Sequence, residues 1–230
     1  MVIEKYRLIE GAKQARGLAV IIDVFRAFSV ACYVFHNGAE KIIAVGSIEK
    51  AYELKRKHSS YVLMGERGGR IQRGFDYGNS PTHIEEVRFA GKTVVQTTSA
   101  GTQGIDSAKN ADEIVTGSFV NASAVVDYIR RKEPKVVSLV AMGEAGLRPA
   151  DEDELCAGYI ADELEERPVD FGAIVDRLRA GSGRRLLNPA HADWSPPRDF
   201  DLCLRLNRFR FVLRVKRDAE SLAVLRRIDL

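Results

Sequence analysis

The fold class is decided by Leu18-Ala-Val-Ile-Ile-Asp-Val24, a short apolar run rich in β-branched residues that predicts a buried strand. A helix is expected next, over residues 27–36, and Asn37-Gly38 would end it. Strand and helix patterns keep alternating up to residue 140. The further strands expected are 41–45, 61–64, 92–97, 113–116 and 136–140, with helices at 48–57, just after 98–102, and at 121–131. This alternation is typical of an α/β protein whose sheet contains parallel pairs.

The last third of the chain has a weaker pattern. The acidic run Asp151-Glu-Asp-Glu154 favours the first turn of a helix, because negative charge stabilises the positive helix end. Helical segments are expected from there to about Leu187. Residues 188–197 predict a proline-bearing loop around Trp194, the only tryptophan. The chain is then expected to end with a strand over 209–215 and a helix over 219–226.

Composition places few limits on function. The chain has 230 residues, 45% of them hydrophobic and 29% charged, which suits a globular protein and excludes a largely disordered one. No internal repeat or low-complexity linker divides it, so a single unit over residues 1–230 is expected, either undivided or built as two interlocked α/β lobes. The formal net charge of +3 gives no reason to expect a nucleic-acid partner.

The cysteines and the N-terminus indicate the cellular compartment. Cys32, Cys156 and Cys203 are far apart and lack CxxC spacing, which argues against both a disulfide framework and a zinc site. The first residues lack the pattern of a signal peptide, and no apolar run approaches the ~20 residues that a membrane helix needs. We therefore expect a protein of the reducing cytoplasm with no membrane partner.

Regular periodicity stops between Gly65 and Pro81. This stretch holds five glycines together with aromatic and charged residues. A loop of this length inside a compact domain is usually either functional or disordered. Its particular aromatic and charged residues favour a functional loop.

Four loops that follow expected strands carry carboxylates, arginines, hydroxyls or glycines. They hold Asp23 and Arg26, Glu66 and Arg67, the run Thr97 to Thr102, and Glu144. Ligands of open α/β sheets bind beyond the carboxyl ends of the strands, so the four loops are expected to converge on one pocket.

A phosphate ester suits such a pocket. Glycine loops expose N–H groups to phosphate oxygens, and arginine offsets the negative charge that develops during transfer. Mg²⁺ is held by one or two carboxylates together with water and phosphate oxygens. Residues 65–69 and 97–102 supply the donors, and Arg26 and Arg67 the positive charge. The carboxylates available to a metal are Asp23, Glu66, Asp76, Glu144, Glu152 and Asp153.

Each of these residues also has an ordinary structural explanation. Asp23 on its own is more typical of a turn or a helix cap, Glu66-Arg67 of a surface ion pair, and Asp151–Glu154 of a solvated helix start. The four histidines are scattered and are interpreted as structural or surface residues. Only the convergence of several loops would distinguish a site from these alternatives.

Seven segments carry a more specific pattern. They are Asp23-Val-Phe-Arg-Ala27, Gly65-Glu-Arg-Gly-Gly69, Gly74-Phe-Asp-Tyr-Gly-Asn-Ser-Pro81, Thr97-Thr-Ser-Ala-Gly-Thr102, Gly117-Ser-Phe-Val-Asn-Ala122, Glu152-Asp-Glu-Leu-Cys-Ala-Gly158 and Phe200-Asp-Leu-Cys203. Together they resemble the 2-phosphosulfolactate phosphatase family, in the family's order and over nearly the whole chain. The segment 74–81 is the most specific of them.

The resemblance implies a Mg²⁺-dependent phosphatase that releases phosphate from (R)-2-phospho-3-sulfolactate, a step towards coenzyme M. It also implies a three-layer α/β fold with a mixed, largely parallel sheet flanked by helices, and a homo-oligomer, expected here to be a dimer. With the residue types above, it assigns catalytic roles to Asp23, Arg26, Glu66 and Arg67. Substrate phosphate is assigned to Gly68, Gly69, Asn79, Ser80, Thr97, Thr98, Ser99, Gly101 and Thr102, and Mg²⁺ to Asp23, Asp76, Glu152 and Asp153. A sulfonate on the substrate would need a further cation, for which Arg70, Arg73 and Arg148 are candidates.

Other functions stay open at this level. The substrate of such a phosphatase could be another 2-phospho acid, and the same loops could serve a non-catalytic sensor of a phosphate ligand. Arginines interleaved with Phe209 and Phe211 resemble a basic stacking surface for RNA. The same alternation describes a strand with one buried and one solvated face, which we favour over RNA binding.

Overall fold

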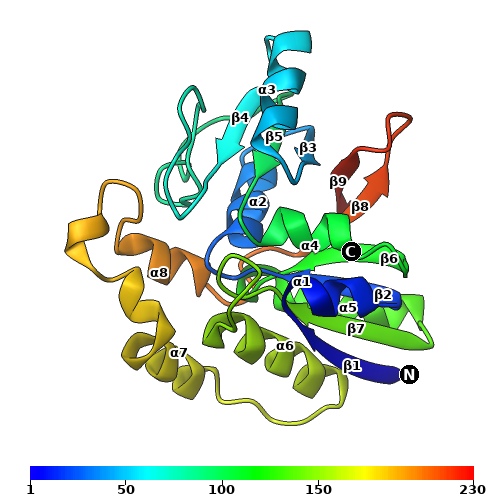
Figure 1. The fold of residues 1–230 in the computed structure, drawn as a ribbon. Helices are drawn as coiled ribbons and strands as arrows, with labels where there is room; N and C mark the ends of the chain where they lie inside the picture. The colour runs from blue at the N-terminus through cyan, green and yellow to red at the C-terminus, as the bar shows by residue number, and fades with distance from the viewer.

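A mixed sheet of nine strands organises the computed structural model, which describes residues 1–230 (Figure 1). The strands are β1 (Val2–Arg7), β2 (Gly17–Ile22), β3 (Lys41–Ala44), β4 (Val62–Gly65), β5 (Thr93–Thr97), β6 (Ala111–Gly117), β7 (Val136–Ala141), β8 (Phe211–Arg217) and β9 (Ala223–Asp229). Their order across the sheet is β1-β7-β2-β6-β8-β9-β3-β5-β4.

Helices cover both faces of the sheet. The α-helices are α1 (Leu8–Gln14), α2 (Ala27–His36), α3 (Ile48–Lys57), α4 (Gly101–Ser107), α5 (Ala122–Lys132), α6 (Asp151–Leu164), α7 (Phe171–Ala180) and α8 (Arg198–Cys203), with 3₁₀ turns η1 (Phe119–Asn121), η2 (Ser182–Arg185) and η3 (Pro189–His191). Helices α1, α2 and α4 pack on one face, and α5 and α6 on the other. None of the helices combines the length and the apolar character needed to cross a bilayer. The helices on both faces of the sheet confirm the predicted three-layer α/β fold with a mixed, largely parallel sheet.

Strand β2 shows why its sequence is apolar at every position. Ala19 and Ile21 belong to the hydrophobic core under α1, α2 and α4, whereas Val20 and Ile22 belong to the core under α5 and α6. Successive side chains of a strand point to opposite faces, and here both faces are covered by helices. The run that predicted the fold class is therefore buried from both sides.

The sheet consists of two parallel blocks joined by an antiparallel hairpin. The β2 block contains β1, β7, β2 and β6, and the β5 block contains β3, β5 and β4. Strands β8 and β9 form the hairpin, which pairs antiparallel with β6 on one side and with β3 on the other. In β8, Arg214 and Arg217 are ion-paired with Glu113 and Asp106, and its apolar residues face the core.

The prediction of a helix over 219–226 is wrong, because residues 223–229 form β9. Alanine, glutamate, leucine and arginine in this stretch favour a helix locally. Pairing with β8 and with β3 satisfies both edges of the strand, and the local preference is overridden. Strand β1 and the helices α1 and α8 were not predicted either, whereas the alternation from residue 18 to residue 141 matches the prediction in type and order.

Candidate active site

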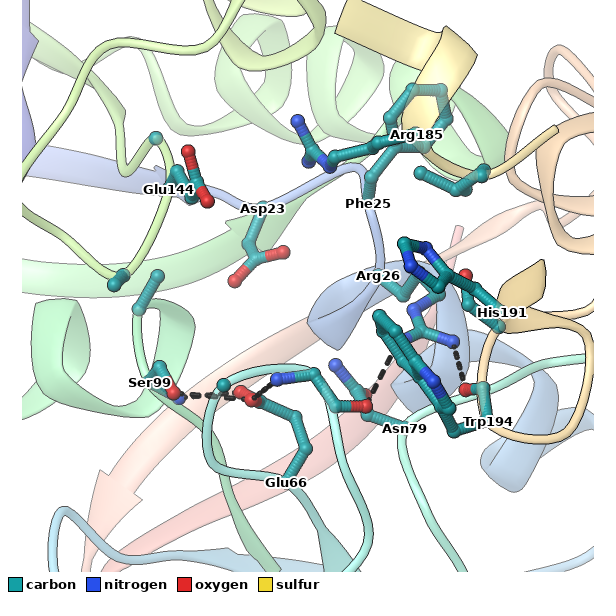
Figure 2. Close-up of a pocket in the computed structure, with 17 residues that line it drawn as sticks. Asp23, Phe25, Arg26, Glu66, Asn79, Ser99, Glu144, Arg185, His191 and Trp194 are labelled. Carbon is teal, nitrogen blue, oxygen red and sulfur yellow. Dashed lines mark hydrogen bonds between the residues drawn. The ribbon is translucent and has the colours of Figure 1, made fainter. Parts of the chain in front are cut away.

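A cavity of about 330 Å³ lies where the carboxyl ends of β2, β4, β5 and β7 meet (Figure 2). The loops after these four strands line it together with a fifth segment, residues 185–195. The four loops contribute, in chain order, Asp23, Glu66, Ser99 and Glu144 to the lining of the cavity. Figure 2 shows Asp23, Glu66 and Glu144 toward one side of the cavity and Arg26, His191 and Trp194 toward the other.

Asp23 follows β2 and is held by two backbone N–H groups. Its Oδ1 accepts from the N–H of Ala27 at 3.0 Å, and its Oδ2 accepts from the N–H of Gly101 at 2.9 Å. A Cβ atom on residue 101 would lie 2.9 Å from Oδ2, so only glycine lets this turn approach the carboxylate. Burial raises the pKa of Asp23 from 3.8 to about 6; the two N–H bonds oppose the rise and the charge of Glu66 adds to it.

Glu66 follows β4 and joins its own loop to the loop after β5. Its Oε1 accepts from the N–H of Ser99 at 2.7 Å, and its Oε2 accepts from the N–H of Gly69 at 2.7 Å and from Ser99 Oγ at 3.1 Å. The residue is 7% exposed. Glu66 thus presents a nearly buried, oriented carboxylate to the cavity.

Hydrogen-bonding groups without a protein partner also line the cavity. The N–H groups of Gly68 and Ala100 have no acceptor within the protein. The side chain of Asn79 is 5% exposed, and its Oδ1 is buried without a hydrogen-bond partner. A buried amide oxygen without a partner is costly, so the Asn79 side chain is available to a ligand, and the two N–H groups are free to donate to one.

Arg26 is neutralised within the protein. Its Nη1 donates to Asp199 Oδ2 at 2.8 Å and to the carbonyl of Trp194 at 2.9 Å. Asp199 is fully buried, and its other oxygen accepts from Ser80 Oγ and from the N–H and hydroxyl of Thr82. Arg26 therefore ties the site to α8, and its charge is already balanced.

Other predicted residues lie behind the cavity. Arg67 donates to the carbonyls of Glu66 and Gly46 and to Thr97 Oγ1, at 2.7–2.9 Å, and does not line the cavity. Thr98 and Thr102 exchange hydrogen bonds with each other: the N–H of Thr98 donates to Thr102 Oγ1 at 2.9 Å, and the N–H of Thr102 to Thr98 Oγ1 at 3.2 Å. These residues shape the loops after β4 and β5.

The candidate metal ligands have different surroundings. Asp153 accepts from the N–H groups of Val24 and Gly143, both at 2.8 Å, and its burial raises its pKa well above the usual value. Glu152 accepts from Ser182 Oγ and from Arg185. The side chain of Asp76 is 42% exposed, and the carboxylate accepts from the N–H of Leu63 outside the cavity. Of the four predicted metal ligands, only Asp23 lines the cavity.

The charges of the cavity suit a divalent cation shared with a ligand. No group of three or more His, Cys, Asp or Glu side chains forms a protein-only cage. Mg²⁺ is commonly bound by one or two carboxylates plus water and substrate oxygens, and Asp23 and Glu66 can supply them. Neither carboxylate has an ion-pair partner, whereas Arg26 and Arg185 are each paired with another acid. The donor set therefore fits Mg²⁺.

Sequence reasoning missed the contribution of residues 185–199. Arg185, His191 and Trp194 line the cavity, and Asp199 anchors Arg26. His191 Nδ1 is buried without a partner, and its ring lies 4.7 Å from that of Trp194. The segment lacks periodicity, and the only tryptophan beside a histidine in a proline-bearing loop was the one signal of a role.

Comparison with known proteins shows which family the chain is related to. A family model described as 2-phosphosulpholactate phosphatase matches residues 4–218. The chain belongs to this family. Three similar proteins, each named a probable 2-phosphosulfolactate phosphatase, come from Thermotoga petrophila (41% identical over 155 residues, 67% of this chain), Carboxydothermus hydrogenoformans (35% over 214 residues, 86%) and Bacillus subtilis (30% over 204 residues, 87%). The matched segments cover 66%, 86% and 88% of those proteins, so the chain spans just under two thirds of the Thermotoga relative.

The part of the chain that matches the 2-phosphosulpholactate phosphatase family includes the whole candidate site. The matched region contains all four loops of the cavity and the segment 185–199. The resemblance first seen in seven short segments thus extends over most of the chain.

Proposed function

We propose that the chain is a Mg²⁺-dependent phosphatase of the cytoplasm that hydrolyses a small organic phosphate monoester. The leading candidate substrate is (R)-2-phospho-3-sulfolactate, which would yield 3-sulfolactate and phosphate. One observation carries the proposal: two nearly buried carboxylates, Asp23 and Glu66, without ion-pair partners lie in the same cavity as unpartnered N–H groups. Donors suited to an anion beside unbalanced negative charge make chemical sense when a cation lies between them.

The protein groups have distinct roles in this mechanism. Asp23 and Glu66 would hold Mg²⁺, which when bound supplies positive charge to the transferring phosphoryl group. The N–H groups of Gly68 and Ala100 and the NH₂ group of Asn79 donate to the phosphoryl oxygens and orient them. Asp23 acts either as the nucleophile or as the group that positions the attacking water. Trapping with hydroxylamine under single-turnover conditions separates these routes, because only the covalent route forms an aspartyl phosphate, which hydroxylamine converts to a hydroxamate at Asp23 with release of phosphate.

The size of the cavity supports a small substrate. Its volume of about 330 Å³ lies near the lower end of the ~300–1,000 Å³ typical of ligand pockets.

All three cysteines are buried and free, which suits the reducing cytoplasm. We keep a homodimer as part of the proposal on the basis of the family resemblance.

A phosphate-release assay tests the proposal. Wild-type protein is offered a panel of small phosphomonoesters, including p-nitrophenyl phosphate, 2-phospho-3-sulfolactate and other 2-phospho acids, with Mg²⁺ and with EDTA. Release that requires Mg²⁺ and is fastest for 2-phospho-3-sulfolactate supports the full proposal. Release that is fastest for another 2-phospho acid replaces the substrate, and no release from any compound rejects the phosphatase.

A further inference from the structure

Arg185 lines the cavity from a segment that supplies none of the proposed phosphoryl-binding groups. We propose that Arg185, held by the buried Glu152, binds a second acidic group of the substrate, a carboxylate or a sulfonate. It would thereby select phosphate esters of small hydroxy acids over esters that lack the second acid. This inference rests on the proposed phosphatase function for its substrate and adds a residue that determines specificity.

Glu152 fixes Arg185 from behind. Its Oε1 accepts a hydrogen bond from Arg185 Nη2, and its Oε2 accepts one from Ser182 Oγ at 2.6 Å. The side chain of Glu152 is 2% exposed, whereas that of Arg185 is 37% exposed. The guanidinium carbon also lies 5.9 Å from the ring centroid of Phe25. The acid is buried and the arginine is not, so the rest of the guanidinium is available on the cavity side.

Arg185 has more N–H donors without a protein acceptor than Arg26 has. A guanidinium carries five N–H donors in a planar fork. In Arg185 only Nη2 has a protein acceptor. Arg26 is 6% exposed and uses both of its terminal nitrogens, toward Asp199, Trp194 and Gly69. Arg185 is therefore the cavity arginine that can form a two-point contact with a planar or tetrahedral anion.

The three arginines predicted for a sulfonate lie elsewhere. Arg148 is bound to Glu144 at 3.1 Å, and Arg70 lies over the ring of Trp194, 5.5 Å from its centroid. Neither of them, nor Arg73, lines the cavity. In this proposal, the cation for the second acidic group of the substrate is Arg185, which comes from a different part of the chain.

The charge of the pair favours a singly charged acid over the phosphoryl group. Glu152 and Arg185 together are neutral, so the pair contributes directed hydrogen bonds with little net positive charge. A transferring phosphoryl group carries more negative charge and needs a net cation, which the Asp23 and Glu66 side of the cavity can hold. A carboxylate or sulfonate needs only the fork of donors.

Kinetics with two matched substrates test the inference. Arg185→Gln is compared with Arg184→Gln, a control in the same 3₁₀ turn whose side chain is exposed and without an ion pair. For 2-phospho-3-sulfolactate, Arg185→Gln should raise KM by about 10- to 100-fold with kcat within about threefold, the size expected for lost hydrogen bonds to a charged group. KM for isopropyl phosphate, which has no second acid, should not change. Arg185→Lys should recover part of the loss. Equal losses on both substrates, or no loss on either, overturn the inference.

Calorimetric titration with 3-sulfolactate keeps this test separate from that of the phosphatase function. Wild type and Arg184→Gln should bind the compound in the presence of Mg²⁺, and Arg185→Gln should bind it about 10- to 100-fold more weakly while it still unfolds in one cooperative transition above the assay temperature. If the wild type hydrolyses nothing but shows this difference, the phosphatase proposal fails and the anion site stands. If the wild type hydrolyses phosphoesters but Arg185→Gln binds 3-sulfolactate as tightly as the wild type does, the anion site fails. It also fails if the wild type does not bind 3-sulfolactate.

Discussion

The two parallel blocks of the sheet hold their cavity carboxylates in different ways. Asp23 of the β2 block accepts one N–H from its own block, that of Ala27, and one from the β5 block, that of Gly101. Glu66 of the β5 block takes all its donors from that block, from Gly69 and Ser99. Asp23 therefore depends on how the two blocks are placed relative to each other, whereas Glu66 depends on local loop structure.

The comparison predicts the largest effect for Asp23→Asn. An amide has one acceptor oxygen, so its NH₂ group would face the N–H of Ala27 or Gly101 and break a link that the carboxylate makes. We expect kcat to fall by at least about 10³-fold, measured as Mg²⁺-dependent phosphate release. The control is Asp76→Asn, an exposed aspartate of the β5 block outside the cavity, which should stay within a few-fold of wild type. Wild-type turnover in Asp23→Asn would remove Asp23 from the mechanism.

A smaller loss is expected for Glu66→Gln. The amide keeps one acceptor and loses the other, which leaves the N–H of Ser99 or Gly69 unpaired and weakens metal binding. Turnover should fall about 10²-fold, and the free energy of unfolding by about 1–3 kcal/mol. Glu144→Gln is the matched control from the β2 block, because its half-exposed carboxylate lines the cavity but accepts no backbone N–H. If Glu144→Gln costs more activity than Glu66→Gln, anchoring by backbone donors is not what matters.

The pH dependence of Mg²⁺ stabilisation tests the buried charge of Asp23. Burial raises the folded-state pKa of Asp23 from 3.8 to about 6, so the folded state binds the proton more tightly than the unfolded state. Metal-free protein therefore loses stability as pH rises from about 4 to about 6, by at most about 3 kcal/mol from this group. A bound cation favours the ionised form and cancels the loss. The rise in melting temperature on adding Mg²⁺ should be larger at pH 7.5 than at pH 4.5.

Comparing each pH point with and without Mg²⁺ cancels the contribution of surface ion pairs. Asp23→Asn should show little Mg²⁺ stabilisation at either pH. An equal Mg²⁺ effect at both pH values in the wild type would contradict a metal at this carboxylate.

The smallest effect is expected for Arg67→Met. Arg67 donates to Thr97 Oγ1 and to the carbonyls of Glu66 and Gly46, so it supports the loop that carries Glu66. It does not line the cavity, and its loss should lower kcat by less than about tenfold and reduce stability by about 1–2 kcal/mol. Urea unfolding and phosphate release measure the two effects. A loss of activity as large as that of Asp23→Asn would show that Arg67 contacts the substrate.

The strands from β2 to β7 and the loops at their carboxyl ends were predictable because their pattern is local. The apolar run 18–24 must be covered on both faces, and the alternation that follows predicts parallel strands with polar residues at one edge. From this alternation Asp23, Glu66 and Ser99 were assigned to one pocket, the family resemblance added Asn79, and the structure brings all four together.

The partners of those residues were not predictable from local pattern. Glu152 resembled a metal ligand in a dense acidic run, but it lies against Arg185, 33 residues further along the chain. Arg26 resembled a free cation, but Asp199 neutralises it from 173 residues away. Nothing in the neighbouring sequence of either residue indicates which charge it will meet.

The sequence by itself determined the α/β class, the order of the elements from residue 18 to residue 141, and the residues that follow each strand, because hydrophobic period and turn chemistry act over a few residues. Only the tertiary structure decided that residues 223–229 form a strand between β8 and β3, and which charges stay unpaired in the cavity. Strand pairing and ion pairing depend on distances between segments far apart in the chain, and those distances exist only once the two blocks have packed.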